Sequence, residues 1–203
     1  MTEHVLLQTR RDALLATLAL AGGAGAIAAA ARAETPGGAL AMAQAAGLSG
    51  DLHDWDYVMG DWTAVNRKLK KRWTNNPEWD EFPSRARYVQ YLGGAANIDE
   101  TTFPTKGSGG LTVRVFDQQR RLWSIYWVDS KNPSDLGTPM VGGYRGEHGL
   151  FYGEDEDDGQ PIKVRFIRTK QPPDKDRWEQ AFSKDGGASW ETNWTADFTR
   201  IRA

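Results

Sequence analysis

Five charged residues lie within apolar runs of the sequence, where a charge needs a partner. Arg114 lies in LTVRVF and Arg165 in KVRF, while Glu100, Glu179 and Glu191 occupy comparable positions in other runs. A buried charge is costly unless it is paired or meets a ligand. An arginine among apolar neighbours can bind a carboxylate or phenolate, and a desolvated glutamate can act as a general base. The alternative for each residue is an outward, solvated position.

One run, RLWSIYWVDS, concentrates aromatic residues that could line a ligand cavity. Side chains alternate between the two faces of a strand, so Trp123, Ile125 and Trp127 share one face while Ser124 and Tyr126 share the other. Either face could line a cavity, and plain core packing is the alternative. Nine tryptophans in one chain need a core or a ligand to cover them. We therefore take Trp123, Tyr126 and Trp127 as candidate ligand contacts.

Composition excludes several kinds of site. The chain has no cysteine, which excludes disulfides and thiolate ligands. His53 and His148 have no acidic or histidine partner at ligand spacing, so no metal site is predicted. His148 lies in a predicted turn, so haem is not expected there and no cofactor is predicted. A net charge of −2 offers no basic surface to nucleic acid.

Two further motifs are interpreted as turns. The run EDEDDGQ lacks the residue spacing of an EF-hand loop. The run SKDGGASW fits the Asp-box of sialidase propellers, but it occurs once, whereas such propellers repeat it. Gly186 and Gly187 can adopt positive φ, Asp185 can accept backbone amides, and Trp190 can pack back on the sheet. We predict hairpin turns here, not a calcium site or a glycan-cleaving site.

The first 33 residues are typical of an export signal. Arg10 and Arg11 precede an apolar run rich in Ala and Gly, which ends at the small residues Ala31 and Ala33. The segment TRRDALL resembles the twin-arginine export motif. We predict a twin-arginine signal peptide at 1–33, a periplasmic or otherwise exported protein, and no stable membrane span after cleavage. An uncleaved membrane anchor is the alternative.

The rest of the chain predicts a linker, one short helix and a series of strands. Residues 34–50 are small and flexible and predict a linker, with a loose helix as the alternative. Leu52, Trp55 and Val58 fall at helical spacing before a glycine, which predicts a helix over 51–59. Short runs bounded by Gly, Pro, Asn or Asp predict strands, at 61–72, 78–82, 85–92, 95–103, 111–117, 121–129, 139–145, 149–154, 161–169, 176–183 and 188–201.

The connections between these strands are too short for crossover helices, so neighbours are expected to pair antiparallel. Closure into a barrel removes exposed edges. The predicted fold is therefore all-β: a closed antiparallel meander barrel of about ten strands over 51–203, preceded by one short helix. In the final strand, alternation places Asn193 on the face opposite a mainly apolar set: Trp190, Thr192, Trp194, Ala196 and Phe198.

Gly60-Asp61-Trp62, which follows the predicted helix, resembles the start of lipocalins and related calycin barrels. The resemblance implies that Trp62 closes the barrel floor under an arginine of the last strand, Arg200 or Arg202. A wider set of segments resembles an uncharacterised bacterial family of lipocalin-like barrels and covers nearly all of the mature domain. The resemblance implies an interior cavity and brings no established reaction. The segments are DYVMGDWTAVNRKL, EWDEF, GGAANIDETTFP, GLTVRVFD, RLWSIYWVDS, FYGEDEDDGQPIKVRFI and RWEQAFSKDGGASWETNW.

The first functional hypothesis is an exported module that binds a small amphipathic or aromatic molecule. Arg114 and Arg165 would meet an anionic group of that ligand by charge-assisted hydrogen bonds. The other predicted ligand contacts are Trp123, Tyr126, Trp127 and Asn193.

The alternative hypothesis is a cofactor-free enzyme of isomerase, cyclase or lyase type. Glu100, Glu179 or Glu191 would act as the general base, and Tyr126 as the acid or hydrogen-bond donor. A protein-interaction or envelope-structural domain is a third hypothesis. The sequence leaves open the oligomeric state and which strand faces line the cavity.

Overall fold

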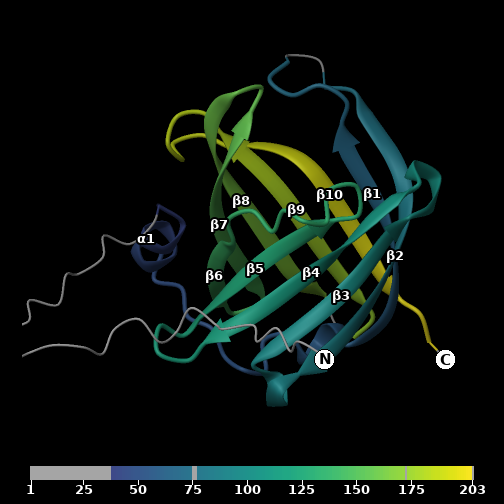
Figure 1. The fold of residues 1–203 in the computed structure, drawn as a ribbon, viewed down its shortest axis with the longest axis vertical. Coiled ribbons are helices and arrows are strands. Elements are labelled where there is room, and N and C mark those ends of the chain that lie inside the picture. Colours follow the sequence, from purple (N-terminus) through teal and green to yellow (C-terminus); the bar gives the residue numbers. More distant parts are fainter. Residues whose placement is uncertain (1–37, 75–76, 172, 203) are drawn as a thin grey trace, which may run out of the picture. The chain divides into compact units, whose positions relative to one another are not determined.

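Ten antiparallel strands close into one barrel, in which each strand pairs with the next and the last pairs with the first (Figure 1). The structure is a computed structural model and describes residues 38–74, 77–171 and 173–202. This architecture confirms the predicted fold class. The predicted signal peptide at 1–33 lies outside the described residues. The strands are β1 Gly60–Leu69, β2 Trp79–Tyr91, β3 Ala96–Phe103, β4 Ser108–Asp117, β5 Leu122–Asp129, β6 Met140–Arg145, β7 His148–Asp157, β8 Gln160–Gln171, β9 Lys175–Ser183 and β10 Glu191–Arg200.

Strand β2 joins two runs that the sequence predicts as separate strands, at 78–82 and 85–92. Pro83 lies between them and pairs with Val65 of β1. Pairing of β2 with β3 begins only at Arg85, so the other edge of the strand is unpaired at Pro83. A proline lacks the N–H for a ladder bond and is tolerated at such an edge. The strand therefore continues through the proline.

A short helix precedes the barrel, as predicted, but at a different position. Helix α1, Gly38–Ala45, lies within the predicted linker and packs outside the barrel on β6 and β7 (Figure 1). The prediction of a helix over 51–59 is wrong: this segment forms turns and the 3-10 helix η1, Asp56–Val58. Asp54 and Asp51 accept backbone N–H groups of Asp51 and His53, which competes with helical hydrogen bonding.

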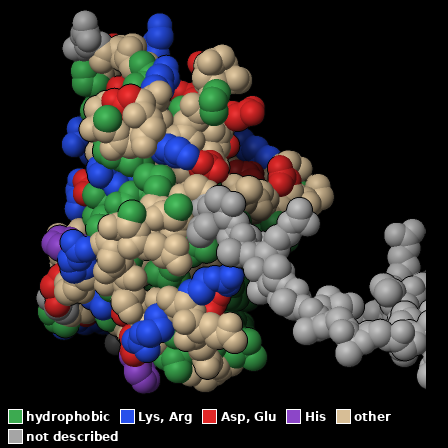
Figure 2. All heavy atoms as spheres, turned by 90° about the vertical axis from the view of Figure 1, so that its left-hand side faces the viewer, with side chains coloured by type: hydrophobic (Ala, Val, Ile, Leu, Met, Phe, Trp, Pro, Cys, Tyr) green, Lys and Arg blue, Asp and Glu red, His purple; other side chains and the backbone are tan. Residues whose placement is uncertain are grey.

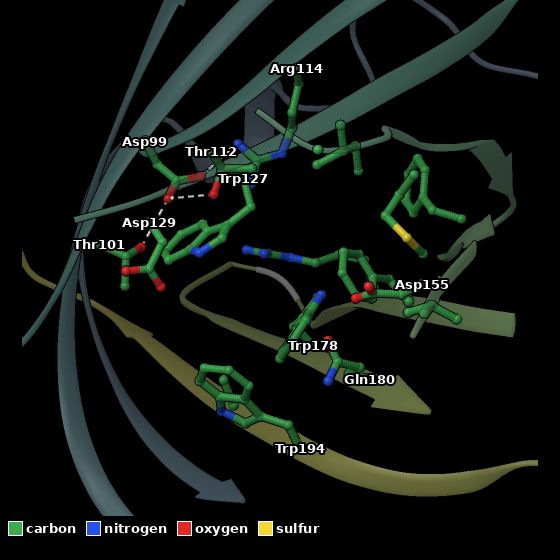
Figure 3. A pocket seen from close by; sticks show the side chains of 18 of the residues that line it. Asp99, Thr101, Thr112, Arg114, Trp127, Asp129, Asp155, Trp178, Gln180 and Trp194 are labelled. Carbon is green, nitrogen blue, oxygen red and sulfur yellow. Dashed lines mark hydrogen bonds and ion pairs between the residues drawn. The ribbon is translucent and has the colours of Figure 1, made fainter. Parts of the chain in front are cut away.

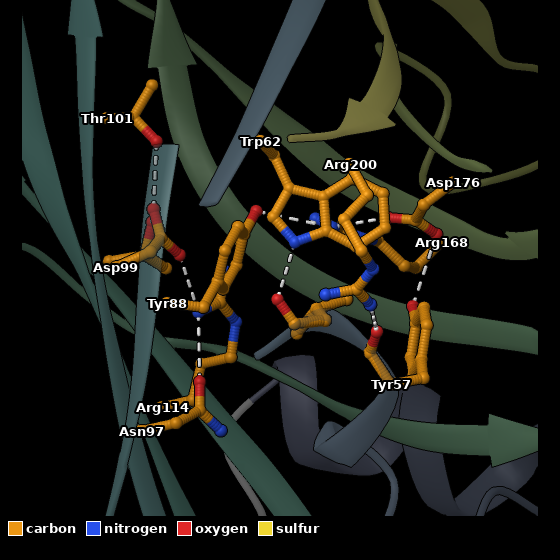
Figure 4. A network of polar contacts seen from close by, with 12 residues as sticks. Tyr57, Trp62, Tyr88, Asn97, Asp99, Thr101, Arg114, Arg168, Asp176 and Arg200 are labelled. Atoms are coloured by element: carbon orange, nitrogen blue, oxygen red, sulfur yellow. Dashed lines mark hydrogen bonds and ion pairs between the residues drawn. The ribbon is translucent and has the colours of Figure 1, made fainter. Parts of the chain in front are cut away.

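The 51–59 segment closes one end of the barrel, and we call this closed end the floor. Trp55 and Val58 are fully buried there. The Trp62 indole N–H donates to the Val58 carbonyl at 2.6 Å, and the Arg200 guanidinium lies 4.3 Å from the centre of the Trp62 ring (Figure 4). Arg200 also donates to the Met59 carbonyl at 2.6 Å. The contact that the lipocalin resemblance implies between Trp62 and Arg200 is thus present.

Gly60 joins the floor to β1 with a φ of 107°. Few residues other than glycine adopt this left-handed region at low cost. A Cβ at this position would also lie 3.4 Å from the Arg200 guanidinium. Gly60 therefore allows the chain to turn from the floor into the first strand beneath Arg200.

The SKDGGASW segment forms the connection between β9 and β10, as predicted. Asp185 accepts the backbone N–H and the hydroxyl of Ser189, at 2.9 and 2.6 Å. The Trp190 indole N–H donates to the Gly187 carbonyl at 2.9 Å, and Gly186 and Gly187 have positive φ. Asp185 and the Trp190 indole make their hydrogen bonds within the connection, and the Trp190 ring packs against Arg165 of β8, so the motif has a structural role.

The outer surface carries charges of both signs. Figure 2 shows acidic and basic side chains interspersed with apolar ones on the face where α1 lies. Over the described part of the chain, no helix has the length and apolar character needed to cross a membrane.

Candidate functional site: the barrel lumen

The lumen holds a cavity of about 460 Å³ that opens at the end opposite the floor. Its base is formed by Trp55, Tyr88, Arg114 and Arg168, and part of its rim by the loop 130–139 between β5 and β6. The wall between them is mainly aromatic (Figure 3). Its aromatic residues are Phe103, Trp127, Phe151, Phe166, Trp178, Trp194 and Phe198.

The aromatic wall is held by edge-on ring contacts. Trp178 makes T-shaped contacts with Phe166 and Trp194, with ring centres 5.1 and 5.6 Å apart. Such contacts fix ring orientation and leave the faces available for a flat apolar ligand. In Figure 3 Trp127, Trp178 and Trp194 face the same space. The wall therefore offers area to an aromatic molecule.

A first buried ion pair lies at the base, between Arg114 of β4 and Asp99 of β3, with Nη1 and Oδ1 2.6 Å apart. Arg114 also donates to the Asn97 amide oxygen at 3.0 Å. The second oxygen of Asp99 accepts the hydroxyls of Thr101 and Thr112 at 2.9 and 3.1 Å (Figure 3). Both oxygens of this carboxylate are thus occupied.

A second buried ion pair joins Arg168 of β8 and Asp176 of β9 (Figure 4). Arg168 donates to the Tyr88 hydroxyl at 3.2 Å, and Asp176 accepts the Tyr57 hydroxyl at 3.2 Å. Burial raises the pKa of Asp176, although Arg168 opposes that rise. Burial also raises the pKa values of Tyr57, Tyr88 and Tyr144, so these phenols stay neutral at physiological pH.

Beneath the base lie buried hydrogen-bond donors that no described residue satisfies. They are the indole N–H of Trp55, the Nε–H of Arg114 and of Arg168, and the amide N–H of Asn97. Arg114 and Arg168 lie 4.5 and 5.8 Å from the centre of the Trp55 ring, so three of the four groups adjoin one aromatic ring. A buried donor without a partner is costly. These donors are enclosed by protein atoms, so they lie beneath the cavity surface and not on it.

The entrance of the cavity is acidic. The carboxylates at the entrance are those of Asp129, Asp135 and Asp155, and none of the ion pairs in the described part of the chain involves them. Glu154 also borders the opening, but its carboxylate pairs with Lys163 on the outer face, beside α1.

The ammonium group of Lys68 lies beside this entrance. It is 4.3 Å from the centre of the Trp194 ring, which belongs to the aromatic wall. Burial lowers the pKa of Lys68, and the charge of Asp129 opposes that change. The lysine offsets part of the negative charge at the entrance.

The β1–β2 connection crosses one side of the open end. The contacts that hold it there are called the hairpin clasp, and they are made by Arg72, Trp73, Asp157 and Glu191. Arg72 forms an ion pair with Asp157, and the Trp73 indole N–H donates to the same carboxylate at 2.7 Å. The Trp73 backbone N–H donates to both oxygens of Glu191, at 2.9 and 3.1 Å. The clasp thereby fastens the β1–β2 connection to the β7–β8 turn and to the start of β10.

Substituting Asp157→Asn is expected to lower the free energy of unfolding by about 2 kcal/mol at neutral pH, because hydrogen bonds to a buried charged acceptor are lost. The hydrogen bond from Arg72 lowers the pKa of Asp157 below its ordinary value of 3.8. The contribution is therefore complete above that value and is lost as the pH falls through the folded pKa. Urea unfolding across this pH range should show the gap between wild type and variant closing in acid.

The control for this substitution is Asp158→Asn, which changes the exposed neighbour of Asp157. It should leave the unfolding free energy close to that of the wild type. A gap for Asp157→Asn that stayed constant with pH would contradict a contribution from the carboxylate charge.

The predicted ligand contacts divide between the two faces of the barrel. Arg114 and Trp127 line the cavity, and the side chain of Arg114 is buried there. Trp123 also points inward but lies below the cavity, packed edge-on against Trp55 with ring centres 6.2 Å apart. Tyr126 alternates with these tryptophans and so lies on the outer face, paired with Val113.

Arg165 also lies on the outer face, since the neighbouring residues Val164 and Phe166 line the cavity. Its guanidinium lies 4.5 Å from the centre of the Trp190 ring. The structure therefore does not bring Arg165 to the cavity, where the apolar residues of β8 take the inward positions.

Asn193 occupies a β-bulge of β10, where the register with β9 shifts between Thr192 and Trp194. Its amide oxygen accepts from Gln180, which lines the cavity, at 2.9 Å. Because the bulge adds a residue, Thr192 and Trp194 do not share a face, and the simple alternation predicted for this strand fails there.

The three candidate general bases lie away from the cavity lining. Glu100 is exposed on the outer face of β3. Glu179 forms an ion pair with Arg177 at 2.9 Å, and Glu191 belongs to the hairpin clasp. The structure does not bring these glutamates together, nor does it bring Tyr126 near any of them at hydrogen-bond distance among the described contacts.

His148 begins β7 and is exposed, with its Nδ1 3.3 Å from the Thr169 hydroxyl. It does not line the cavity. Within the described residues, no group of three or more His, Asp or Glu side chains is placed to hold a metal ion.

Sequence reasoning missed Asp99, Arg168, Asp176 and Tyr88. A signal existed for Arg168: in VRFIR, the alternation of Val164 and Phe166 continues to Arg168 and not to Arg165. No comparable signal marks Asp176, which follows a turn and is surrounded by charged residues.

No known protein-family model matches the chain, and a search of curated proteins finds no match to it.

Proposed function

We propose that the barrel binds a small amphipathic or aromatic molecule in its lumen. The observation that carries this proposal is the cavity of about 460 Å³, with an aromatic wall above a base that holds two buried ion pairs. Ligand sites typically have this character: they are concave, mainly apolar, and supplied with a few polar groups that fix orientation. The volume falls within the range of small-molecule pockets.

Binding accounts for the site better than catalysis by an internal base. Glu100, Glu179 and Glu191 do not line the cavity. The carboxylate that does lie at its base, Asp99, is already engaged by Arg114 and two hydroxyls. A general base needs an accessible oxygen within hydrogen-bond reach of the substrate. These placements support binding over catalysis by one of these carboxylates.

The proposal is tested by native mass spectrometry of the protein purified from its own cells, compared with the denatured mass. A mass excess that disappears on denaturation is expected, and its value identifies the ligand. Ligand affinity in Trp178→Ala should fall about tenfold, because the wall loses a large aromatic surface. Trp190→Ala is the matched control: it removes a tryptophan of the outer face and should leave affinity unchanged. Equal losses in both variants would contradict a site in the lumen.

We also propose that this binding takes place outside the cytoplasm, on the strength of the signal-like segment at 1–33. Replacing Arg10 and Arg11 by lysines is expected to retain the protein in the cytoplasmic fraction. Cell fractionation and immunoblotting measure this outcome. Unchanged export of the lysine variant would contradict the twin-arginine route.

A further inference from the structure

The charged side chains of the cavity are distributed unevenly between its base and its entrance. At the base, Arg114 is paired with Asp99 and Arg168 with Asp176, and all four side chains are buried. The base is therefore balanced in charge. An anion that reached it would find each guanidinium already paired with a carboxylate.

The entrance, in contrast, carries carboxylates without cationic partners. Asp129, Asp135 and Asp155 line it, and none of the ion pairs in the described ranges involves any of the three. Fixed carboxylates around the mouth of a cavity attract cations and repel anions that approach it. The entrance therefore favours a ligand with positive charge.

Three cations near the open end are engaged or directed elsewhere. Lys163 is paired with Glu154 and Arg72 with Asp157. Lys131 belongs to the rim loop, but it is exposed and does not line the cavity. None of these cations neutralises the three aspartates of the entrance through a described ion pair.

Lys68 shows that this end of the barrel can hold an ammonium group. It pairs in the sheet with Trp194 and continues the inward alternation of Trp62 and Asn66. Its ammonium lies 4.3 Å from the centre of the Trp194 ring, which is a cation–π contact. Asp129 is close enough for its charge to favour the ammonium form. A ring face of the wall and a carboxylate of the entrance therefore already act together on one cation.

Two other ring faces at this end are available for a second cation. Trp127 and Trp178 face the same space as Trp194 (Figure 3), and none of the cation–π contacts found among the described residues involves either of the two. Figure 3 shows Asp129 and Asp155 beside this space. A ligand ammonium can thus meet a ring face and a carboxylate together, in the arrangement already seen on Trp194.

We propose that the ligand is an aromatic molecule that carries a protonated amine. Its aromatic body lies against the wall, and its ammonium group lies between the entrance carboxylates and the faces of Trp127 and Trp178. This inference rests on the proposed binding function and narrows its ligand class. It differs from the expectation that arginines recognise an anion, because Arg114 is already paired and Arg165 lies on the outer face.

Three probes of one size separate the contributions of charge and ring: naphthylmethylammonium, naphthylmethanol and naphthoate. Each is titrated by calorimetry into the purified protein at neutral pH and low salt. The ammonium is expected to bind at least about tenfold more tightly than the alcohol, and naphthoate more weakly than both. Added salt should reduce the advantage of the ammonium, because it screens the carboxylates. Tightest binding by naphthoate or by the alcohol would overturn the inference.

Substitutions at the entrance locate the cation through the ratio of ammonium to alcohol affinity, which cancels effects on the aromatic body. Asp155→Asn should lower this ratio about threefold. Asp61→Asn is the matched control: it neutralises an exposed carboxylate at the floor end of β1 and should leave the ratio unchanged. Lys68→Met removes the cation that the protein itself supplies, so the ratio should rise about threefold. Equal ratios in the two aspartate variants, or a lower ratio in Lys68→Met, would contradict a cation site at the entrance.

Failure of this inference is distinguishable from failure of the proposed function. Equal affinities for all three probes would leave a binding cavity in place and overturn the assignment of a cationic ligand. No binding of any probe, together with identical native and denatured masses, would overturn both.

Discussion

Replacing Asp176 with asparagine is expected to lower the free energy of unfolding by about 3–5 kcal/mol, measured by urea denaturation. The substitution leaves the Arg168 guanidinium buried without its carboxylate, and a buried charge without a partner strongly lowers the stability of the folded state. The Tyr57 hydroxyl also loses its charged acceptor.

The matched control is Asp197→Asn, which breaks another Arg–Asp pair between β9 and β10. Asp197 is half exposed and its partner is Arg177, so the loss should be at most about 1 kcal/mol. Substituting both members of the buried pair, as Arg168→Met with Asp176→Leu, should cost less than Asp176→Asn alone. Equal losses for the buried and exposed pairs would contradict the role of burial.

Substituting Trp62→Ala is expected to destabilise the barrel by about 3–5 kcal/mol, as large-to-small changes of buried aromatic residues do. Trp62 is only 1% exposed, and its loss removes the indole hydrogen bond to Val58 together with the surface beneath Arg200. Thermal and urea unfolding should agree on the size of the effect.

Trp127→Ala serves as the comparison, since it removes the same side chain from a site that is 37% exposed. It should cost less than half as much stability, because less apolar surface is lost from burial. If Trp127→Ala destabilised the protein as strongly as Trp62→Ala, the floor would have no special part in stability.

The fold could be predicted from the sequence because turn residues mark the ends of most strands. Runs bounded by Gly, Pro, Asn or Asp fall close to the observed strands, and short connections require antiparallel neighbours. The helix was harder to place. Leu52, Trp55 and Val58 have helical spacing, but Asp51 and Asp54 bind the local backbone and convert the segment into turns.

The site could be predicted only in part, because the inward face of each strand is decided by its neighbours. In β3 the apolar Ile98 faces outward and the polar Asn97 and Asp99 face inward, where Arg114 of the next strand completes the pairing. No property of the β3 sequence alone reveals that partner. The aromatic Trp127 was accessible to prediction, since it belongs to a face with two other large apolar residues.

The β-bulge at Asn193 also limits how well the inward-facing residues of β10 can be predicted from the sequence. One extra residue reverses the faces on either side of it, so alternation read straight through β10 places Thr192 with Trp194. Pairing with β9 shows that they lie on different faces. Bulges arise from register between strands, which a single strand's pattern does not contain.

Pairing of the first strand with the last has a consequence for how the protein folds. Trp62 lies opposite Arg200, residues 138 positions apart (200 − 62). Until the last strand is made, β1 and β9 are open edges that can pair with other chains. Contacts of such long range close slowly, because the entropy of a long loop is lost before the contact forms. The barrel therefore cannot close until β10 has been synthesised, and before that point β1 and β9 remain open to pairing with other chains.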